Sequence, residues 1–213
     1  MLPAAFFIVL GRGKEMLTHG NFRLVDVGTG VRVTEGLTDL RTMTIPLNRV
    51  QALEVIQPIW WRPLGWWRVR VNVAGVGSSG SGDGEGERET TLLPVGTLDD
   101  ALRVLTLLAP RVPASQWNDA VLGEGPQRGW QTSSARAKLF DPLSWRRNGW
   151  SDTDGAVLLR SGRLTRRAIA VPHARIQSLT LQQGWLQASR RVATLHVIPA
   201  PGPISPVIDH LDT

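Results

Sequence analysis

The sequence predicts a mainly β protein made of two tandem copies of one small, bent antiparallel barrel. First, a stretch that begins at Arg41 recurs from Arg167, at a constant shift of 126 residues. Second, most apolar segments are short and alternate with polar residues, as half-buried antiparallel strands do. Third, a single amphipathic helix follows the strands of the first copy. Parallel α/β folds are excluded because they interleave helices with strands.

The repeat runs through much of both halves of the chain. Matching positions include Asp26/Asp152, Val31/Val157, Gly36/Gly162, Arg41/Arg167, Pro46/Pro172, Arg49/Arg175, Gln51/Gln177, Leu53/Leu179, Gln57/Gln183 and Val71/Val197. Solenoid repeats have periods of about 20–50 residues, so this longer period indicates a duplicated domain. The total of 213 residues suits two domains of about 100 residues each.

The first copy contains short strands and then one helix. We expect strands at residues 22–26, 30–35, 40–47, 50–57, 66–73 and 89–95. Between the last two strands, residues 77–87 are rich in Gly, Ser and acids, which is typical of an exposed loop. A helix is predicted from a capping Thr97 to about Ala109, because apolar residues recur at helical spacing after two first-turn acids.

The second copy repeats the strands without the helix. Residues 111–141 are predicted to be a linker, with a short helix at 116–122. Strands are expected at 145–151, 156–160, 163–171, 175–183 and 192–198. We therefore predict domains at 14–110 and 142–213, the second of them shortened at its C-terminus. Either the chain is cut short, or another segment covers the apolar core at that end.

The N-terminus contains a nine-residue apolar run, residues 2–10, followed by Arg12 and Lys14. A spanning helix needs about 20 apolar residues, so this run cannot cross a bilayer alone. From these residues alone, two interpretations are open, one of which is that residues 1–13 are the remnant of a transmembrane helix with the basic residues at its cytoplasmic end. The alternative is that the run begins a globular domain.

Charge and composition limit the functions that the chain can have. Cysteine is absent, which excludes disulfides and thiolate chemistry. The net charge of +6 lies entirely in residues 111–213, because residues 1–110 are neutral. The second half is therefore attracted to anionic surfaces. No nucleophile elbow, paired-carboxylate site or nucleotide motif is present, so we predict a non-enzymatic protein without cofactor or metal.

The loop at residues 58–67, PIWWRPLGWW, is the sharpest local feature. Trp favours the headgroup level of a bilayer, and Arg can hold its charge in water or on a phosphate. A membrane or partner interface is predicted there, comprising Trp60, Trp61, Arg62, Trp66 and Trp67. The alternative is that some of these side chains cap the core.

Arginines of the second copy form the second candidate site. A basic surface is predicted from Arg146, Arg147, Arg163, Arg166, Arg167, Arg190 and Arg191. Beside a cytoplasmic leaflet, each would add about 1 kcal/mol of attraction to anionic lipid. The alternative is a set of scattered, solvated side chains.

Three sequence motifs resemble a known family. They are PLNRVQALEV at 46–55, RPLGWWRVRV at 62–71, and the block from SGRLTRR to LQQG at 161–184. They resemble the bacterial pleckstrin-homology-like domains, also called bacterial membrane-flanked or YdbS/YdbT-like domains. The resemblance implies a pleckstrin-homology (PH)-like barrel, and a parent protein in which such barrels alternate with transmembrane helix pairs.

We therefore predict a membrane-associated PH-like module that acts by contact with lipid or protein, as part of a multi-pass bacterial membrane protein. Its partner would be an anionic membrane surface or a membrane protein, and its place the cytoplasmic side of the cell membrane. The alternative function is a basic β-barrel that binds nucleic acid. It is less favoured because the first half is neutral and aromatic and basic residues do not interleave on the strands.

Overall fold

The computed structural model describes residues 23–28, 30–35, 41–74, 91–127, 129–200 and 202–212. The predicted helix remnant at 1–13 and the acidic loop at 77–87 lie outside these residues. Within the described chain, no helix has both the length and the apolar character needed to cross a membrane. The chain divides into two compact units, Met1–Asn48 and Arg49–Thr213.

The first unit is an antiparallel sheet in the order β1-β2-β3. Its strands are β1 (Arg23–Asp26), β2 (Gly30–Glu35) and β3 (Arg41–Pro46), and the 3₁₀ turn η1 (Leu47–Arg49) leads out of it. Val31 and Ile45 are cross-strand partners and are both buried. These strands confirm three of the segments that alternation predicts.

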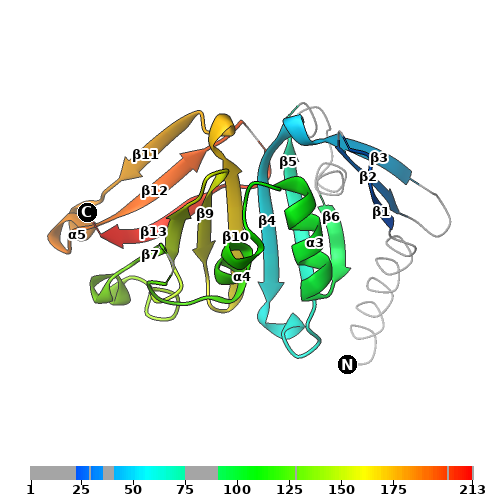
Figure 1. Cartoon of the computed structure of the whole chain (residues 1–213). Coiled ribbons are helices and arrows are strands. Elements are labelled where there is room, and N and C mark those ends of the chain that lie inside the picture. The colour runs from blue at the N-terminus through cyan, green and yellow to red at the C-terminus, as the bar shows by residue number, and fades with distance from the viewer. Residues whose placement is uncertain are drawn as a thin grey trace, which may run out of the picture. The chain divides into compact units, whose positions relative to one another are not determined.

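The second unit contains the rest of both copies (Figure 1). From the first copy come β4 (Val50–Pro58), η2 (Ile59–Trp61), β5 (Trp67–Val73), β6 (Thr91–Gly96) and α3 (Leu98–Leu108). Between the copies lie α4 (Ala114–Leu122), β7 (Gln131–Thr132) and η3 (Ala135–Leu139). The second copy forms β8 (Gly149–Asp152), β9 (Ala156–Ser161), β10 (Thr165–Pro172), η4 (His173–Arg175), β11 (Ser178–Gln182), α5 (Trp185–Ser189), β12 (Val192–Ile198) and β13 (Val207–Asp212).

The duplication extends to individual hydrogen bonds. Strands β1 and β8, strands β2 and β9, and turns η1 and η4 coincide at the same shift of 126 residues. The side-chain amide of Gln57 donates to the Trp66 carbonyl at 3.3 Å, and that of Gln183 donates to the Val192 carbonyl at 3.0 Å. Gln183 and Val192 lie 126 residues after Gln57 and Trp66. The repeated glutamine therefore makes the same hydrogen bond across the corresponding hairpin of each copy.

The predicted class, mainly antiparallel β, is confirmed, but the described sheets remain open instead of closing into two barrels. Strands of both copies share one seven-stranded sheet, in the order β6-β5-β4-β10-β9-β8-β7. Strand β4 of the first copy pairs antiparallel with β10 of the second, from Pro58 opposite Thr165 to Leu53 opposite Ala170. We call this β4–β10 junction the seam.

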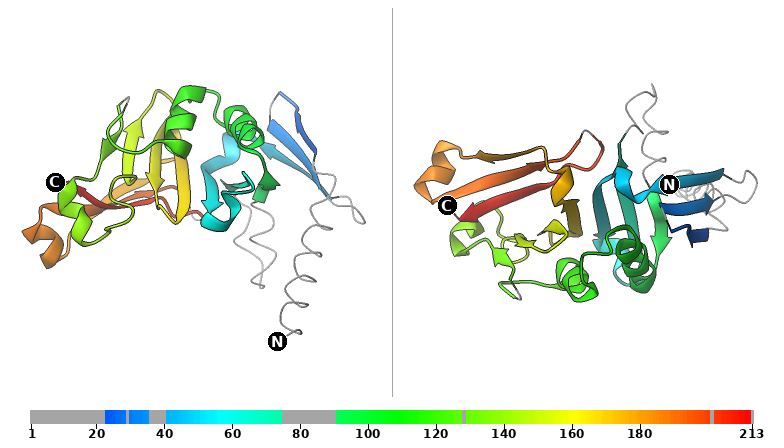
Figure 2. Two further views of the ribbon diagram at one scale, coloured as in Figure 1. Left: turned by 90° about the horizontal axis from the view of Figure 1, so that it is seen from below. Right: turned by 45° about the horizontal axis from the view of Figure 1, so that its top comes forward.

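The two faces of the seven-stranded sheet have different covers (Figure 2). On one face, β9 and β10 pack toward the β11-β12-β13 sheet, and together they enclose the core of the second copy. Its buried members are Leu159, Ile169, Val171, Val197, Ile204, Ile208 and Leu211, and Ala52 of β4 joins them from the first copy. Helix α3 packs on β4, β5 and β6, and α4 packs on β9 and β10. Both helices lie on the face opposite the β11-β12-β13 sheet.

Helix α3 begins where the sequence predicts. The Thr97 hydroxyl accepts from the Asp100 N–H at 3.3 Å, and the Asp100 carboxylate accepts from the Thr97 N–H at 3.1 Å. The Asp100 carboxylate also accepts from the Thr97 hydroxyl at 2.7 Å. The bonds that this carboxylate accepts, first from the Thr97 hydroxyl and then from the Thr97 N–H, lower the pKa of Asp100 because they stabilise its charged form. Helix α4 arises from the segment between the copies and buries Trp117, Ala120 and Val121. Helix α4 thus covers strands of the second copy. In the described residues, no helix follows β13 in the way that α3 follows β6.

Candidate functional site

Two loops from different copies meet at one end of the seven-stranded sheet. Because Pro58 ends β4 opposite Thr165, which begins β10, the loop after β4 lies beside the turn between β9 and β10. In Figure 1 both are at the lower end of these strands. We call residues 58–66 and 161–165 together the tip.

Large apolar side chains of the tip face solvent. Trp60 is 78% exposed, and Leu64 and Leu164 are each 56% exposed. Trp60 and Leu64 come from the first copy and Leu164 from the second. Exposed apolar groups gathered on one feature are typical of a contact surface for a membrane or a protein. The predicted interface included Trp60 among its five residues but neither of the leucines.

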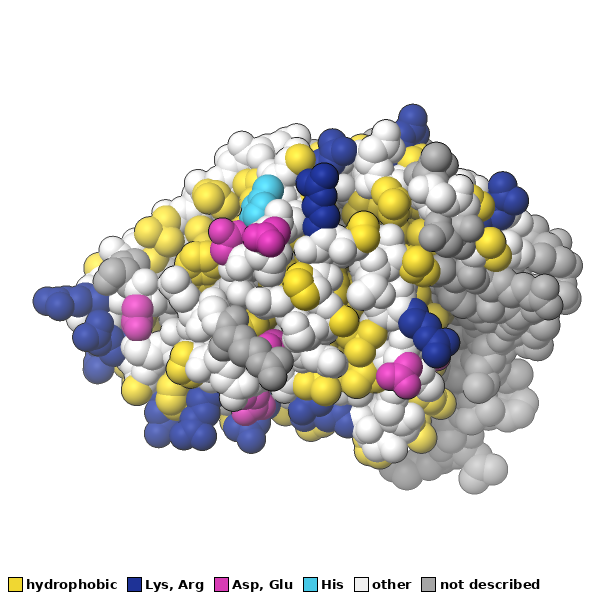
Figure 3. All heavy atoms as spheres, viewed as in Figure 1, with side chains coloured by type: hydrophobic (Ala, Val, Ile, Leu, Met, Phe, Trp, Pro, Cys, Tyr) yellow, Lys and Arg dark blue, Asp and Glu magenta, His cyan; other side chains and the backbone are white. Residues whose placement is uncertain are grey.

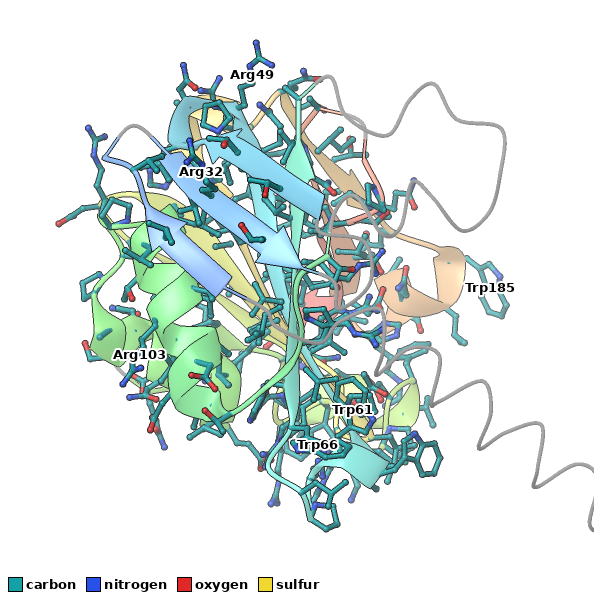
Figure 4. The ribbon with its side chains drawn as sticks, turned by 90° about the vertical axis from the view of Figure 1, so that its right-hand side faces the viewer. Arg32, Arg49, Trp61, Trp66, Arg103 and Trp185 are labelled. Carbon is teal, nitrogen blue, oxygen red and sulfur yellow. The ribbon has the colours of Figure 1, made fainter. Side chains whose placement is uncertain are left out.

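The neighbouring tryptophans hold the loop in shape. The rings of Trp61 and Trp66 meet edge to face with centroids 6.2 Å apart, and the Arg68 guanidinium lies 5.1 Å from the Trp61 centroid. Figure 4 shows the two rings close together at the end of the hairpin. The Trp66 N–H also donates to the Trp61 carbonyl at 3.1 Å. Both rings are half-buried, so they support the loop more than they extend its exposed surface.

The predicted interface residue Trp67 is buried, at 3% exposure, so its assignment to an exposed interface is wrong. It lies on β5 in the alternation that also buries Val69 and Val71. This face of β5 packs toward the protein interior, and its period of two places Trp67 there.

Arg62 and Arg163 belong to the tip, and Arg166 follows directly after it. The Arg62 guanidinium donates to the Arg163 carbonyl, which ties the two loops together. Arg166 donates to the Gln57 side chain at 3.3 Å. Burial, and then the charges of Arg166 and Arg163, lower the pKa of Arg62, while Glu124 opposes them. The positive charges therefore repel one another, and a bound anion would relieve this repulsion.

Two other arginines are structural. Arg147 is 1% exposed and Arg160 is fully buried, so the assignment of Arg147 to a basic surface is wrong. The Arg147 side chain donates to the carbonyls of Ala120, Val121, Gly123 and Ser161 at 2.7–3.3 Å. The Arg160 side chain donates to the carbonyls of Asp119, Gly125 and Arg147, and its guanidinium lies 4.3 Å from the Trp130 ring centroid.

These two guanidinium groups bind the carboxyl end of α4, where helix carbonyls lack partners within the helix and the dipole is negative. Burial lowers the pKa of Arg147 to about 9 and that of Arg160 to about 10. Both side chains thus remain charged at neutral pH. Their role is to fix α4 onto β9, and they are not available to a ligand.

The remaining predicted arginines lie in three separate places. Arg146 is exposed beside Trp145, with its guanidinium 5.2 Å from the ring centroid. Arg167 pairs with Glu54 at the seam, at 2.9 Å. Arg190 and Arg191 are exposed after α5, at the end of the β11–β12 hairpin. Figure 3 shows basic side chains both along the lower end of the sheet and, separately, near α5.

The tip depends on a glycine that the repeat had marked. Gly162 has a φ of 71°, and a Cβ at this position would lie 2.2 Å from the Thr165 carbonyl oxygen. Only glycine fits such a turn, which presents Arg163 and Leu164 at its apex. The repeat matched Gly162 with Gly36, but nothing in the sequence indicated that a turn at Gly162 would lie beside the tryptophan loop.

Histidine and carboxylate side chains form no larger cluster in the described residues. No group of three potential metal ligands occurs among them. His173 is 2.7 Å from the Asp152 carboxylate, and His196 is 3.2 Å from the Gln182 amide oxygen. Each thus has a partner of its own, and the residues described form no catalytic arrangement that we recognise.

The repeated hairpins and open antiparallel sheets make this a tandem β-sheet module. Its exposed apolar loops are typical of proteins that act by binding. The chain belongs to the bacterial PH domain family, which it matches over residues 3–112 and 134–209. The two segments correspond to the two copies, so the resemblance found in the sequence is confirmed. Comparison with curated proteins gives no match. Membership of this family supports a non-enzymatic binding module.

Proposed function

We propose that the protein docks on an anionic membrane surface through the tip, as a PH-like module of a multi-pass bacterial membrane protein. The surface it contacts is the cytoplasmic leaflet. Residues 2–10, with Arg12 and Lys14 after them, are the segment that would connect the module to the bilayer in that setting.

One observation carries this proposal: exposed Trp60, Leu64 and Leu164 lie on the same two loops as Arg62 and Arg163. A bilayer surface offers phosphates outside and acyl chains beneath them. Trp is enriched at that boundary, and the aliphatic stem of Arg can lie in apolar surroundings while its guanidinium contacts phosphate. Apolar groups beside guanidinium groups that repel one another therefore fit an anionic membrane better than an acidic protein surface.

The shape of the tip supports the same proposal. The Trp61–Trp66 contact, the Arg62 bond to the neighbouring turn and the Gln57 bond to Trp66 hold the loops together before any ligand arrives. Binding then loses little conformational entropy, because the contacting side chains stand on a braced support.

Vesicle flotation of the purified full chain tests the proposal. We expect binding to phosphatidylcholine vesicles that contain phosphatidylglycerol, and much weaker binding to phosphatidylcholine alone. Arg163→Gln removes one charge and should weaken binding about fivefold, since one arginine near such a surface contributes about 1 kcal/mol. Trp60→Ala should weaken binding further at every salt concentration, whereas the Arg163→Gln effect should fade as salt is raised.

The chain offers matched controls at α5. Trp185 is 85% exposed and Arg190 is exposed, so Trp185→Ala and Arg190→Gln change the same residue types away from the tip. Both variants should bind vesicles as the wild type does. Equal losses from tip and α5 variants would refute the assignment to the tip. Binding to single-stranded oligonucleotides with a steep salt dependence, and none to vesicles, would favour the nucleic-acid alternative.

A further inference from the structure

Strand β11 is an open edge of the second copy's sheet. It pairs with β12 on one side, and no other strand among the described residues pairs with it. Every residue of β11 is exposed, including Leu179 at 62% and Leu181 at 60%. Its sequence, SLTLQ, contains neither charge nor proline. An unpaired neutral edge of this kind is a template for another strand.

The other described edge strands have features that prevent pairing with a further strand. Strand β6 contains Pro94, and β7 has two residues. Strand β13 carries two acids and is covered by hydrogen bonds from the Ser133 hydroxyl to the Asp209 carbonyl and from the Ser134 hydroxyl to the Asp212 carboxylate. In the first unit, β1 and β3 contain charged residues. Among these edges β11 alone lacks charge, proline and cover.

The first copy shows what such an edge can bind. Strand β4 is the counterpart of β11, and its free edge is filled by β10 at the seam. At the seam Leu53 and Val55 are fully buried, whereas their counterparts Leu179 and Leu181 are exposed. The same hairpin thus exists twice. In the first copy a strand lies on its edge, and in the second copy no strand among the described residues does.

The charges on the candidate strands indicate which of them would pair with the β11 edge. At the seam, Arg167 of β10 pairs with Glu54, whose counterpart in β11 is Thr180. Strand β3 is the counterpart of β10 and carries Arg41, which would find no acid on β11. Strand β11 itself is neutral throughout, so pairing with its own copy opposes no like charges.

We infer that two copies of this chain associate by antiparallel pairing of their β11 strands across a two-fold axis. Centring the register on Thr180 pairs all five residues and places Leu179 opposite the partner's Leu181. These leucines share a face with Val197 and Leu195, their cross-strand neighbours in β12. Since Val197 is buried in the second copy's core, the new leucine pairs would extend that core across the axis. Two-fold interfaces of this self-complementary kind are the commonest in oligomers.

Disulfide trapping tests the geometry directly, because the chain contains no cysteine. In the proposed register Thr180 lies opposite its own copy, at a Cα separation that a disulfide can span. Thr180→Cys should therefore form a covalent dimer under mild oxidation. Thr44→Cys, an exposed threonine on β3, is the matched control and should form far less. A disulfide between mixed Leu179→Cys and Thr44→Cys chains, with none from Thr180→Cys, would show that β3 fills the edge and would overturn the proposal.

Sedimentation of the cysteine-free chain tests association without trapping. Wild type should dimerise with rising concentration, and Thr180→Lys should remain monomeric because two lysines would face each other. An equal mixture of Thr180→Lys and Thr180→Glu should restore the dimer, which a merely misfolded variant could not do. A wild-type chain that stays monomeric to its solubility limit would overturn the inference.

Discussion

At the scale of single residues, the two buried arginines explain why a polar segment between the copies is ordered. Arg147 donates to the Ala120 and Val121 carbonyls at the end of α4, where helix carbonyls lack partners further along the helix. Arg160 adds a donor to the Asp119 carbonyl, which also accepts from the Gly123 N–H. Each guanidinium is costly to bury, but here every guanidinium nitrogen of both side chains donates to a carbonyl. Losing one of these side chains would therefore leave several buried carbonyls without partners.

Arg147→Met should destabilise the protein strongly. Methionine retains the apolar stem but donates nothing to Ala120, Val121 and Gly123, and we expect a loss of about 3 kcal/mol in the free energy of unfolding. Urea titration followed by far-UV circular dichroism measures this. Arg146→Met, at the exposed neighbouring position, should change the free energy by less than about 0.5 kcal/mol. Similar losses from both variants would contradict the role given to Arg147.

Residue patterns predict some of these environments and not others. Arg160 follows Leu158 at a spacing of two on β9, so alternation places it on the buried face. The same logic buries Trp67. Arg147 lies outside the strands, and its burial depends on α4, which approaches from a distant part of the sequence. Charge alone therefore predicts exposure incorrectly for Arg147, and only tertiary contacts reveal its position.

At the scale of elements, the seam turns the two copies into one sheet. Strand β4 reads VQALEVIQP and is buried along most of its length. Inside this strand, Glu54 is 2% exposed and lies between Arg167 at 2.9 Å and Arg70 at 3.6 Å. Burial raises the pKa of Glu54, although both arginines act to lower it. The charged carboxylate is therefore net disfavoured in the folded state.

This raised pKa sets the sign of a pH dependence. Between the unfolded value near 4.5 and the higher folded value, the folded protein binds more protons than the unfolded chain. The contribution of Glu54 to stability is thus complete below that window and lost as pH rises through it. Urea titrations across the window should show the stability of wild type relative to Glu54→Gln falling with pH. A relative stability that rises with pH would mean that the ion pairs outweigh burial.

The elements themselves were largely predictable, whereas their pairing was not. Alternation located β2, β5 and β9, and the capping Thr97 located α3. The run of apolar residues in β4 is what a strand covered on both faces shows, yet it does not name its neighbour. The partner β10 lies more than a hundred residues away, and a hydrophobic pattern specifies the face of a strand but not the strand beside its edge. The tip was missed as a joint feature for the same reason.

At the scale of the whole molecule, the shared sheet predicts that both copies unfold together. All nine tryptophans lie in the unit Arg49–Thr213, so their fluorescence reports on that unit alone. Strands of the two copies cannot separate there without breaking the seam. The unit should behave as one cooperative structure, unlike a pair of domains on a flexible linker.

Core truncations in either copy should therefore shift one common transition. Leu53→Ala in β4 and Leu159→Ala in the second copy's core each remove a fully or almost fully buried side chain. We expect each to cost about 2–5 kcal/mol and to lower the same tryptophan-fluorescence midpoint in urea. Leu139→Ala, at an exposed position, should leave the midpoint unchanged. Two fluorescence transitions, each sensitive to one variant, would show that the copies unfold independently.

A buried asparagine connects the first copy to almost the last residues of the second. The Asn72 side chain donates to the Ile204 carbonyl at 3.1 Å and accepts from the Ile204 N–H at 3.0 Å. During synthesis on the ribosome, β5 must therefore wait for 132 further residues before this amide finds its partner. Strand β4 waits likewise for β10. The first copy therefore reaches its final structure only after the ribosome has made these residues of the second copy.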